Sequence, residues 1–340
     1  MLIKQPPSGN FKPVRFAIQV GDVTGCAADV LALKYANALF GADRTVANAL
    51  GKTEDEIFQA IPMPDTCKLF PGRGKIAARQ ALFLNVGDLY HFNYAAIRQF
   101  AAQVLRVLAQ AGVSTRHLAM TIHGVGYGLD EPEVVRAQLA GYLDAFESGH
   151  YPPEIELITI VEEDPYRAER LRLLLDEAIP TATVMVPRTV GSSISPSVIE
   201  RSPLTSNVGR ESANKPHVFV AMPFSEEMED VYYYGIQSPV NAAGYLCERV
   251  DVVPFSGDIL NRIKERIETA SFVVAELTGA NPNVFLEVGY AWGRDRPTIL
   301  LVQDVKELPF DVRGQRCLVY KSIRDLEKLL AEELEGLARG

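Results

Sequence analysis

Cysteine and histidine are scarce in this chain, and none of them is spaced as a metal site or a disulfide framework requires. The 340 residues include 4 Cys and 5 His. The cysteines lie far apart with no C-x-x-C pair, and the histidines form neither an H-E-x-x-H nor an H-x-H pattern. We therefore expect no metal site and no network of disulfide bonds.

Long apolar runs and an excess of basic residues are also missing. No run approaches the roughly 18 apolar residues that a membrane-spanning helix needs, and the opening segment MLIKQPPSGNFKP lacks the apolar core of a secretory signal. Acidic residues outnumber basic ones, 43 to 34, for a formal net charge of −9, which disfavours binding to the phosphates of nucleic acids. We expect a cytoplasmic protein with no membrane or nucleic-acid partner.

The length and the distribution of residue types predict two globular domains. A chain of 340 residues with 47% hydrophobic and 23% charged residues can bury two separate cores. Residues 189–215 are rich in Ser, Pro, Asn and Gly and have few periodic apolar positions, as is typical of a linker. We therefore expect one domain over residues 11–188 and another over residues 216–340.

Both domains alternate short β-rich segments with amphipathic helical patterns. The clearest helical patterns span residues 94–111, 132–147 and 165–178. The β-rich segments are RFAIQV, ARQALFLNVG, HLAMTIHG, EIELITIVE and TATVMVP before residue 189, and HVFVAMPF, YLCERV, SFVVAELT, TILLVQD and RCLVYKS after residue 215. Strands that alternate with helices form parallel sheets, so the sequence predicts the α/β class for both domains.

One carboxylate, Glu287, interrupts the apolar helical pattern NPNVFLEVGYAWG of residues 281–293. Asn281 followed by a proline is a helix-start signal, which places Glu287 beside an apolar face that includes Phe285, Val288 and Trp292. One interpretation is that Glu287 complements the helix dipole, an effect of about 0.3–1 kcal/mol. The other is that it has a chemical role.

Three polar clusters follow predicted strands of the second domain. They are Met222–Ser225, Ser256–Asp258 and Glu276–Asn283. In an open parallel sheet, ligands bind beyond the carboxyl ends of the strands, so these clusters should converge on one crevice. Taken alone, Asp258 could be a helix cap and Glu276 could simply end its strand. Two acids in one pocket could instead divide nucleophilic and proton-transfer work.

The second domain resembles the nucleoside 2-deoxyribosyltransferase-like proteins, which are related to Toll/interleukin-receptor (TIR) domains. The resemblance is carried by VFVAMPFSEEMEDVY, AGYLCERVD, SGDILNRIKERIETASFVVAELTGANPNVFLEVGYAWG, PTILLVQD and LPFDVRGQRCLVY, and spans nearly all of residues 216–322. It implies a flavodoxin-like sheet. It also implies a catalytic glutamate, Glu287 of the EVGYA motif, that attacks the anomeric carbon of an N-glycoside. Asp258 of the GDIL motif would then contact the sugar or the base.

One position departs from the family pattern. Deoxyribosyltransferases tend to have a second acid about six residues before the glutamate, where this chain has Asn281. The departure disfavours base exchange and favours the TIR-like reaction, hydrolysis of NAD, with NAD as substrate and no resident cofactor. The substrate-binding residues would be Asn283 near the ribose, Met222, Pro223 and Phe224 at the pocket wall, and Asn281. Phe224 could equally be a hydrophobic plug of its loop.

The first domain has a glycine-rich turn in the segment HGVGYGLDEPEVV. Gly124, Gly126 and Gly128 alternate before a predicted helix, so their N–H groups could cradle a phosphate, although such turns often do no more than reverse the chain. The GRGK of residues 72–75 lacks the spacing of a P-loop and is better explained as a hairpin turn between CKLF and ARQALFLNVG.

The first domain resembles a macro domain of the type found at the N-terminus of leucyl aminopeptidases, over residues 16 to 187. The resemblance is carried by GDVTGCAADVLAL, NALFGADRTVANALG, FPGRGKIAARQALFLNVG and HGVGYG. It implies a three-layer domain that binds ADP-ribose or a related nucleotide, with Asp22 recognising the base and with Asn37 and Arg44 in the ligand loop. Asp43 would repel a diphosphate, so an assembly role is an alternative. The peptidase half of those enzymes has no counterpart here.

Three hypotheses follow from these resemblances. The first is a TIR-like effector, similar to bacterial antiviral defence proteins, that hydrolyses NAD, forms homo-oligomers, and is regulated by a nucleotide or by assembly through its macro-like domain. The second is a nucleoside or nucleotide N-glycosidase or 2-deoxyribosyltransferase acting on metabolites. The third is a nucleotide-binding sensor or scaffold with no activity.

Overall fold

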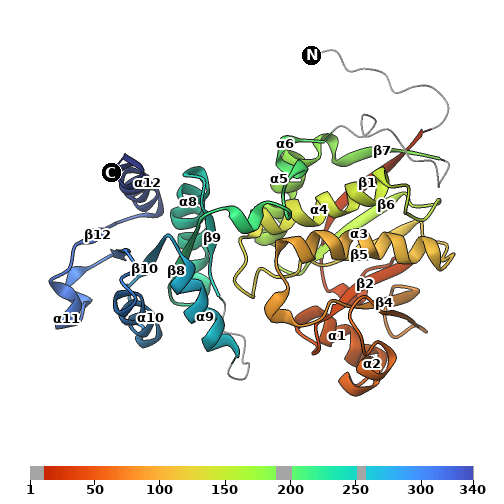
Figure 1. The fold of residues 1–340 in the computed structure, drawn as a ribbon, viewed down its shortest axis with the longest axis horizontal. Coiled ribbons are helices and arrows are strands. Elements are labelled where there is room, and N and C mark those ends of the chain that lie inside the picture. Colours follow the sequence, from red (N-terminus) through yellow and green to blue (C-terminus); the bar gives the residue numbers. More distant parts are fainter. Residues whose placement is uncertain (1–10, 189–200, 251–257, 340) are drawn as a thin grey trace, which may run out of the picture. The chain divides into compact units, whose positions relative to one another are not determined.

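The computed structural model describes residues 11–188, 201–250 and 258–339. The chain divides into two compact units (Figure 1). The first comprises residues 1–124 and 131–213, and the second comprises residues 125–130 and 214–340. The predicted linker covers residues 189–215; residues 189–200 lie outside the described part, and residues 201–213 belong to the first unit.

The first unit is built on a seven-stranded mixed sheet in the order β3-β4-β2-β5-β6-β1-β7. Its inner strands are parallel, and the edge strands β3 and β7 are antiparallel to their neighbours. The strands are β1 (Phe11–Val20), β2 (Val30–Tyr35), β3 (Cys67–Pro71), β4 (Gln80–Asn85), β5 (His117–Met120), β6 (Leu157–Glu162) and β7 (Thr183–Pro187). The hairpin predicted around residues 72–75 is confirmed by the β3–β4 pairing.

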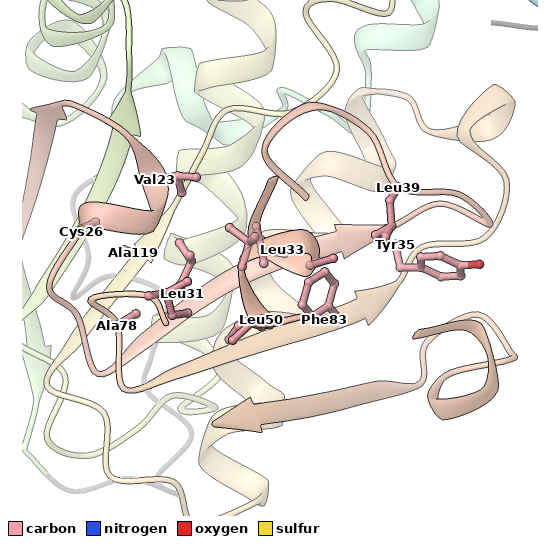
Figure 2. Packing of buried hydrophobic residues seen from close by; sticks show 14 of the residues in the cluster. Val23, Cys26, Leu31, Leu33, Tyr35, Leu39, Leu50, Ala78, Phe83 and Ala119 are labelled. Atoms are coloured by element: carbon pink, nitrogen blue, oxygen red, sulfur yellow. The ribbon is translucent and has the colours of Figure 1, made fainter. Parts of the chain in front are cut away.

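Helices cover both faces of this sheet. They are α1 (Gly41–Leu50), α2 (Glu54–Ala60), α3 (Tyr94–Gln110), α4 (Glu131–Glu147), α5 (Pro165–Ala178) and α6 (Pro203–Ser206). Side chains alternate across a strand, so Leu31 and Leu33 of β2 and Phe83 of β4 face α1 and α2 and form one core (Figure 2).

The opposite face of the sheet packs against α3 and α4. Ala119 of β5 lies in the α1 side core, whereas the next residue, Met120, accepts a hydrogen bond from the hydroxyl of Tyr142 in α4. Helices α3 and α4 run side by side across this face (Figure 1). They approach closely at Gly141, where a Cβ atom would lie 2.1 Å from the carbonyl oxygen of Arg98. The first unit is therefore a three-layer α/β/α structure.

The second unit is built on a five-stranded parallel sheet in the order β12-β11-β10-β8-β9. The strands are β8 (His217–Ala221), β9 (Leu246–Glu248), β10 (Phe272–Glu276), β11 (Thr298–Val302) and β12 (Cys317–Val319). Counted along this unit, the order is 2-1-3-4-5, which is the flavodoxin-like arrangement.

Helices also cover both faces of the second sheet. They are α7 (Glu226–Asp230), the π-helix η5 (Val231–Gln237), α8 (Ser238–Ala242), α9 (Asp258–Thr269), α10 (Pro282–Gly293), α11 (Phe310–Arg313) and α12 (Ile323–Arg339). Elements η5, α8 and α12 share one core, and α9 and α10 share the other. The predicted α/β class is confirmed for both units: the first is a three-layer unit on a mixed sheet, and the second has a flavodoxin-like parallel sheet.

Candidate functional site

The polar clusters predicted in the second unit belong to segments that follow three neighbouring strands, although Ser256 and Gly257 of one cluster lie outside the described residues. Met222 comes directly after β8, Arg249 after β9, and Leu277 after β10. Because the strands are parallel and their order is β9-β8-β10, these three segments leave the same edge of the sheet. The strand order reverses beside β8, and a carboxyl edge at such a switch point is where ligands bind in this fold.

Glu287 lies in the second turn of α10, the helix that follows β10 at this edge. Its side chain is half-buried, and its carboxylate makes no hydrogen bond or ion pair with any other described residue. Burial raises the pKa of Glu287 from 4.5 to about 7, because removal from water disfavours the charged form. A carboxylate without a local partner is free to interact with a ligand. The helix-dipole interpretation does not require such a partly buried, unpartnered position.

The start of α10 is fixed by Asn281. As predicted, Asn281 is the N-cap: its Oδ1 accepts a hydrogen bond from the N–H of Asn283 at 2.9 Å, and a proline follows. Asn283 itself is exposed. The apolar face differs from the expectation at one position, because Trp292 is 38% exposed. The buried stripe is Val284, Val288 and Ala291, with Phe285 packed against it.

The segment after β8 forms an aromatic and cationic cluster with Arg249. Met222 is buried, Pro223 is half-buried and Phe224 is exposed. The buried guanidinium of Arg249 lies 5.0 Å from the ring centroid of Phe224 and 4.0 Å from that of Tyr232. Its Nη2 also donates to Glu229 at 2.9 Å. Cation–π contacts of this kind stabilise an aromatic ring in a fixed place.

Arg249 is a residue that sequence reasoning missed. It stands at the end of the β-rich segment YLCERV and has no motif of its own. Its partners Phe224 and Tyr232 come from other elements, so only the folded structure brings them together.

Glu276 is part of a structural network rather than an open acid. It is fully buried, and its Oε1 accepts hydrogen bonds from the hydroxyls of Thr278 and of Tyr320, the latter at 2.9 Å. Burial raises the pKa of Tyr320 to about 12, so its hydroxyl keeps the proton it donates. The other predicted acid, Asp258, is the first residue of α9, but its side chain lies outside the described part of the structure.

In the first unit, the predicted ligand loops leave the carboxyl edge of the sheet. Asn37 follows β2 and Gly124 follows the adjacent strand β5, so the fold brings these two loops together. Asp22 follows β1, which β6 separates from β5. Asn37 and Arg44 are exposed. Asp22 is also exposed, and hydrogen bonds from the hydroxyl and the N–H of Thr24 lower the pKa of its carboxyl.

Asp43 does not face outward as the sequence analysis assumed. It is 1% exposed and pairs with the buried ammonium of Lys34 at 2.5 Å. The repulsion of a diphosphate that we expected from Asp43 is therefore offset by Lys34. Nearby, burial and the Lys34 ammonium lower the pKa of His123 well below its ordinary value, so its ring is neutral. Neither Asp43 Oδ1 nor His123 Nε2 has a hydrogen-bond partner among the described residues.

The glycine-rich turn is divided between the two units. Gly124 belongs to the first unit and has a φ of 101°, whereas Gly126 and Gly128 belong to the second unit. Gly126 is exposed and Gly128 is buried, with a φ of 98°. The three glycines predicted to cradle one phosphate therefore have different surroundings.

Within the described residues, no group of three or more His, Cys, Asp and Glu side chains is arranged to hold a metal ion. In the same part of the chain, every helix is too short or too polar to span a membrane.

No family model and no curated protein matches the chain. Several solved structures are similar to it at low TM-scores. A macrodomain mutant from Oceanobacillus iheyensis has a TM-score of 0.39 and 13% identity, covering 47% of this chain and 89% of its own. A Trypanosoma brucei macrodomain in complex with ADP-ribose has a TM-score of 0.38 and 17% identity, covering 47% of this chain and 69% of its own.

A CMP N-glycosidase from Clostridium botulinum has a TM-score of 0.29 and 21% identity, covering 34% of this chain and 98% of its own.

Proposed function

We propose that the second unit is an N-glycosidase whose substrate is NAD, and that Glu287 is its catalytic residue. The observation that carries the proposal is a half-buried carboxylate with no partner among the described residues, at the carboxyl edge beside the switch point of a flavodoxin-like sheet. Such a position is suited to a sugar whose anomeric carbon becomes cationic during cleavage.

The chemistry requires one bond to break and one to form. The bond between C1′ of the ribose and the ring nitrogen breaks, and nicotinamide leaves as a neutral molecule with the bonding electron pair. The ionised carboxylate of Glu287 stabilises the developing positive charge at C1′, either by its field or by a covalent bond. Water then supplies the hydroxyl of the second product, ADP-ribose, and releases a proton.

The surroundings of Glu287 support this role. In apolar surroundings a charge–charge interaction is stronger than in water, so the cationic substrate ring and the carboxylate attract each other. The same attraction lowers the carboxyl pKa when substrate binds. Phe224 and Met222, ordered by Arg249, would provide an apolar wall for the nucleotide. Asp258 and Asn283 would contact the ribose.

The first unit is proposed to bind a small nucleotide at its carboxyl edge and to regulate the second. The support is the placement of the Asn37 and Gly124 loops on adjacent strands, together with the neutralisation of Asp43 by Lys34. Within this proposal the protein is an effector similar to those of bacterial antiviral defence.

A substrate panel tests the proposed reaction. Purified full-length protein is incubated separately with NAD, nucleosides and nucleoside monophosphates, and nicotinamide and free bases are measured by liquid chromatography. We expect nicotinamide release by the wild type, a loss of at least ~100-fold in Glu287→Gln, and near wild-type release by Glu268→Gln. Glu268 of α9 is the matched control. It is also a glutamate, and it accepts a hydrogen bond from Tyr290 of α10, the helix that contains Glu287.

Release of bases from nucleosides or their monophosphates, and not of nicotinamide, would favour the metabolic N-glycosidase instead. No cleavage of any substrate over a range of protein concentrations would favour a binding protein. Either result contradicts NAD as the substrate.

A further inference from the structure

Six residues of the N-terminal half of the chain, Val125–Asp130, belong to the second unit. The chain leaves the first unit after Gly124 and re-enters it at Glu131, the first residue of α4. The sequence interpretation assigned this segment to a phosphate-cradling turn. Its contacts within the second unit indicate a different use.

Asp130 binds the edge strand β9. Its carboxylate is 1% exposed, and Oδ2 accepts hydrogen bonds from the N–H of Cys247 in β9 at 2.9 Å and from the side chain of Asn241 in α8 at 2.8 Å. An edge strand has backbone groups that no neighbouring strand pairs. A buried N–H without an acceptor is costly, so Asp130 contributes directly to the stability of β9.

Tyr127 and Gly128 contact Val250, the second residue after the end of β9. Tyr127 forms an antiparallel bridge with Val250. A Cβ atom on Gly128 would lie 2.7 Å from Val250 Cγ2, and the φ of +98° is one that residues with side chains rarely adopt. Close contact with Val250 thus explains a glycine that the sequence interpretation assigned to phosphate binding.

The segment also fixes the position of Arg249, which immediately precedes Val250. Arg249 is buried and stacks on Tyr232 and Phe224. Asp130 holds β9 at Cys247, and Tyr127 holds the chain at Val250. Arg249 therefore lies between two points of attachment, which limits its freedom to move away from Phe224.

We propose that Val125–Asp130 is a structural part of the second unit that holds the end of β9, and that Arg249 is thereby a positioning residue for the candidate substrate site. The first statement concerns the fold alone. The second rests on the proposed function, because it assigns Phe224 to the wall of the substrate site.

Amide hydrogen exchange of the full-length protein tests the first statement without any assay of activity. We compare Gly128→Ala with Gly244→Ala, a matched control that has a φ of +89° but no atom within 4 Å of the added Cβ. We expect amides of Leu246–Val250 to exchange at least ~10-fold faster in Gly128→Ala, and within ~3-fold of wild type in Gly244→Ala. Amides of β2 in the first unit serve as the internal reference.

A milder variant, Asp130→Asn, gives the same test should Gly128→Ala not fold. It keeps the side-chain shape but replaces the charged acceptor of two hydrogen bonds, so the Cys247 amide should again exchange ~10-fold faster. Unchanged protection of β9 in Asp130→Asn, or equal effects of Gly128→Ala and Gly244→Ala, would overturn the proposal.

Kinetics with NAD test the positioning role of Arg249. The variant Arg249→Lys retains the charge but loses the planar group that stacks on Phe224. We expect KM to rise at least ~5-fold, with a smaller change in kcat and the same pH dependence as wild type. An unchanged KM would overturn the positioning role. If the wild type releases no nicotinamide, the proposed function fails, while the exchange result still decides whether the segment holds β9.

Discussion

At the scale of single residues, the environment of Glu287 makes its charge costly to the folded state. Its pKa in the folded protein is about 7, above the ordinary value of 4.5. The folded state therefore binds this proton more tightly than the unfolded state does. The resulting stabilisation is present at low pH and is lost as the pH rises through about 7. A residue that serves stability alone would not be expected in such a place.

The variant Glu287→Gln should therefore gain stability relative to wild type as the pH rises. Gln has no charge to bury, so we expect the difference in unfolding free energy between variant and wild type to grow by about 2 kcal/mol from pH 5 to pH 8. Urea denaturation at the two pH values measures it.

The control is Glu268→Gln. Hydrogen bonds with Tyr290 and Arg294 lower the pKa of Glu268, so this variant should show no such gain at high pH. A constant difference between Glu287→Gln and wild type at both pH values would show that the Glu287 carboxyl titrates normally and is well solvated.

The surroundings of some residues could be predicted from the sequence, and those of others could not. Glu287 stands in a local motif next to a helix cap, so the sequence contains both its environment and its neighbours. Arg249 and Asp43 are different, because their partners Phe224, Tyr232 and Lys34 lie on other elements. Whether a charged side chain turns inward depends on such partners, which no local pattern of residues reveals.

At the scale of elements, helix α10 places both the cap residue Asn281 and Glu287. The cap satisfies the N–H of Asn283, one of the backbone donors that a helix leaves unpaired at its start. Position 281 is also the one at which deoxyribosyltransferases, which the second domain resembles, tend to have a second acid. Asp and Asn cap helices about equally well, so the two roles can be separated by substitution.

Two variants of Asn281 test this separation. Asn281→Ala should lower the unfolding free energy by about 1 kcal/mol, because the capping hydrogen bond is lost. The unfolding free energy of Asn281→Asp, measured by urea denaturation, should differ from that of wild type by no more than about 0.5 kcal/mol. Because Asp also caps the helix, any base exchange between deoxynucleosides that appears in Asn281→Asp is due to the introduced carboxylate. An Ala variant as stable as wild type would contradict the capping role.

Amphipathic helices were the elements best predicted from the sequence. The patterns at residues 94–111, 132–147 and 165–178 correspond to α3, α4 and α5 within one residue at each end. The inner strand β2 was not among the predicted strands, because VLALKY has no alternation of apolar and polar residues, and all six of its residues are buried. Residues from about Glu226 have a helical pattern, but no local pattern predicts the π form of η5. Its Gly235 lies where a Cβ atom would be 2.6 Å from Leu326 of α12, a contact made only by tertiary packing.

At the scale of the whole molecule, the division into units is less simple than one linker suggests. A composition change predicts the 189–215 linker, but the assignment of Val125–Asp130 to the second unit depends on contacts with residues more than a hundred positions away. Residues 201–213 belong to the first unit, where Arg98 donates to the carbonyl oxygens of Ser206 and Val208 at 3.1 and 2.6 Å. Polar composition alone does not predict these contacts.

Self-association is a prediction at this scale. The resemblance to TIR-like proteins implies sites completed by a neighbouring copy, and Leu286 and Trp292 of α10 are 65% and 38% exposed. We expect the full-length protein to form concentration-dependent oligomers in sedimentation velocity experiments, and Leu286→Asp to weaken them by at least ~10-fold in Kd. A wild-type protein that remains monomeric at all concentrations would contradict this prediction.

The central claim, that ionised Glu287 assists cleavage of the glycosidic bond, is tested most directly by the pH dependence of nicotinamide release. The value of kcat/KM reports the free enzyme, so for the wild type it should rise with pH through an apparent pKa of about 7 and then level off. Above about pH 7, where the wild-type carboxyl is ionised, Glu287→Gln should be at least ~100-fold slower, and its rate should not follow this titration. A wild-type profile that falls across this range, or a Gln variant with wild-type rates, would contradict the account.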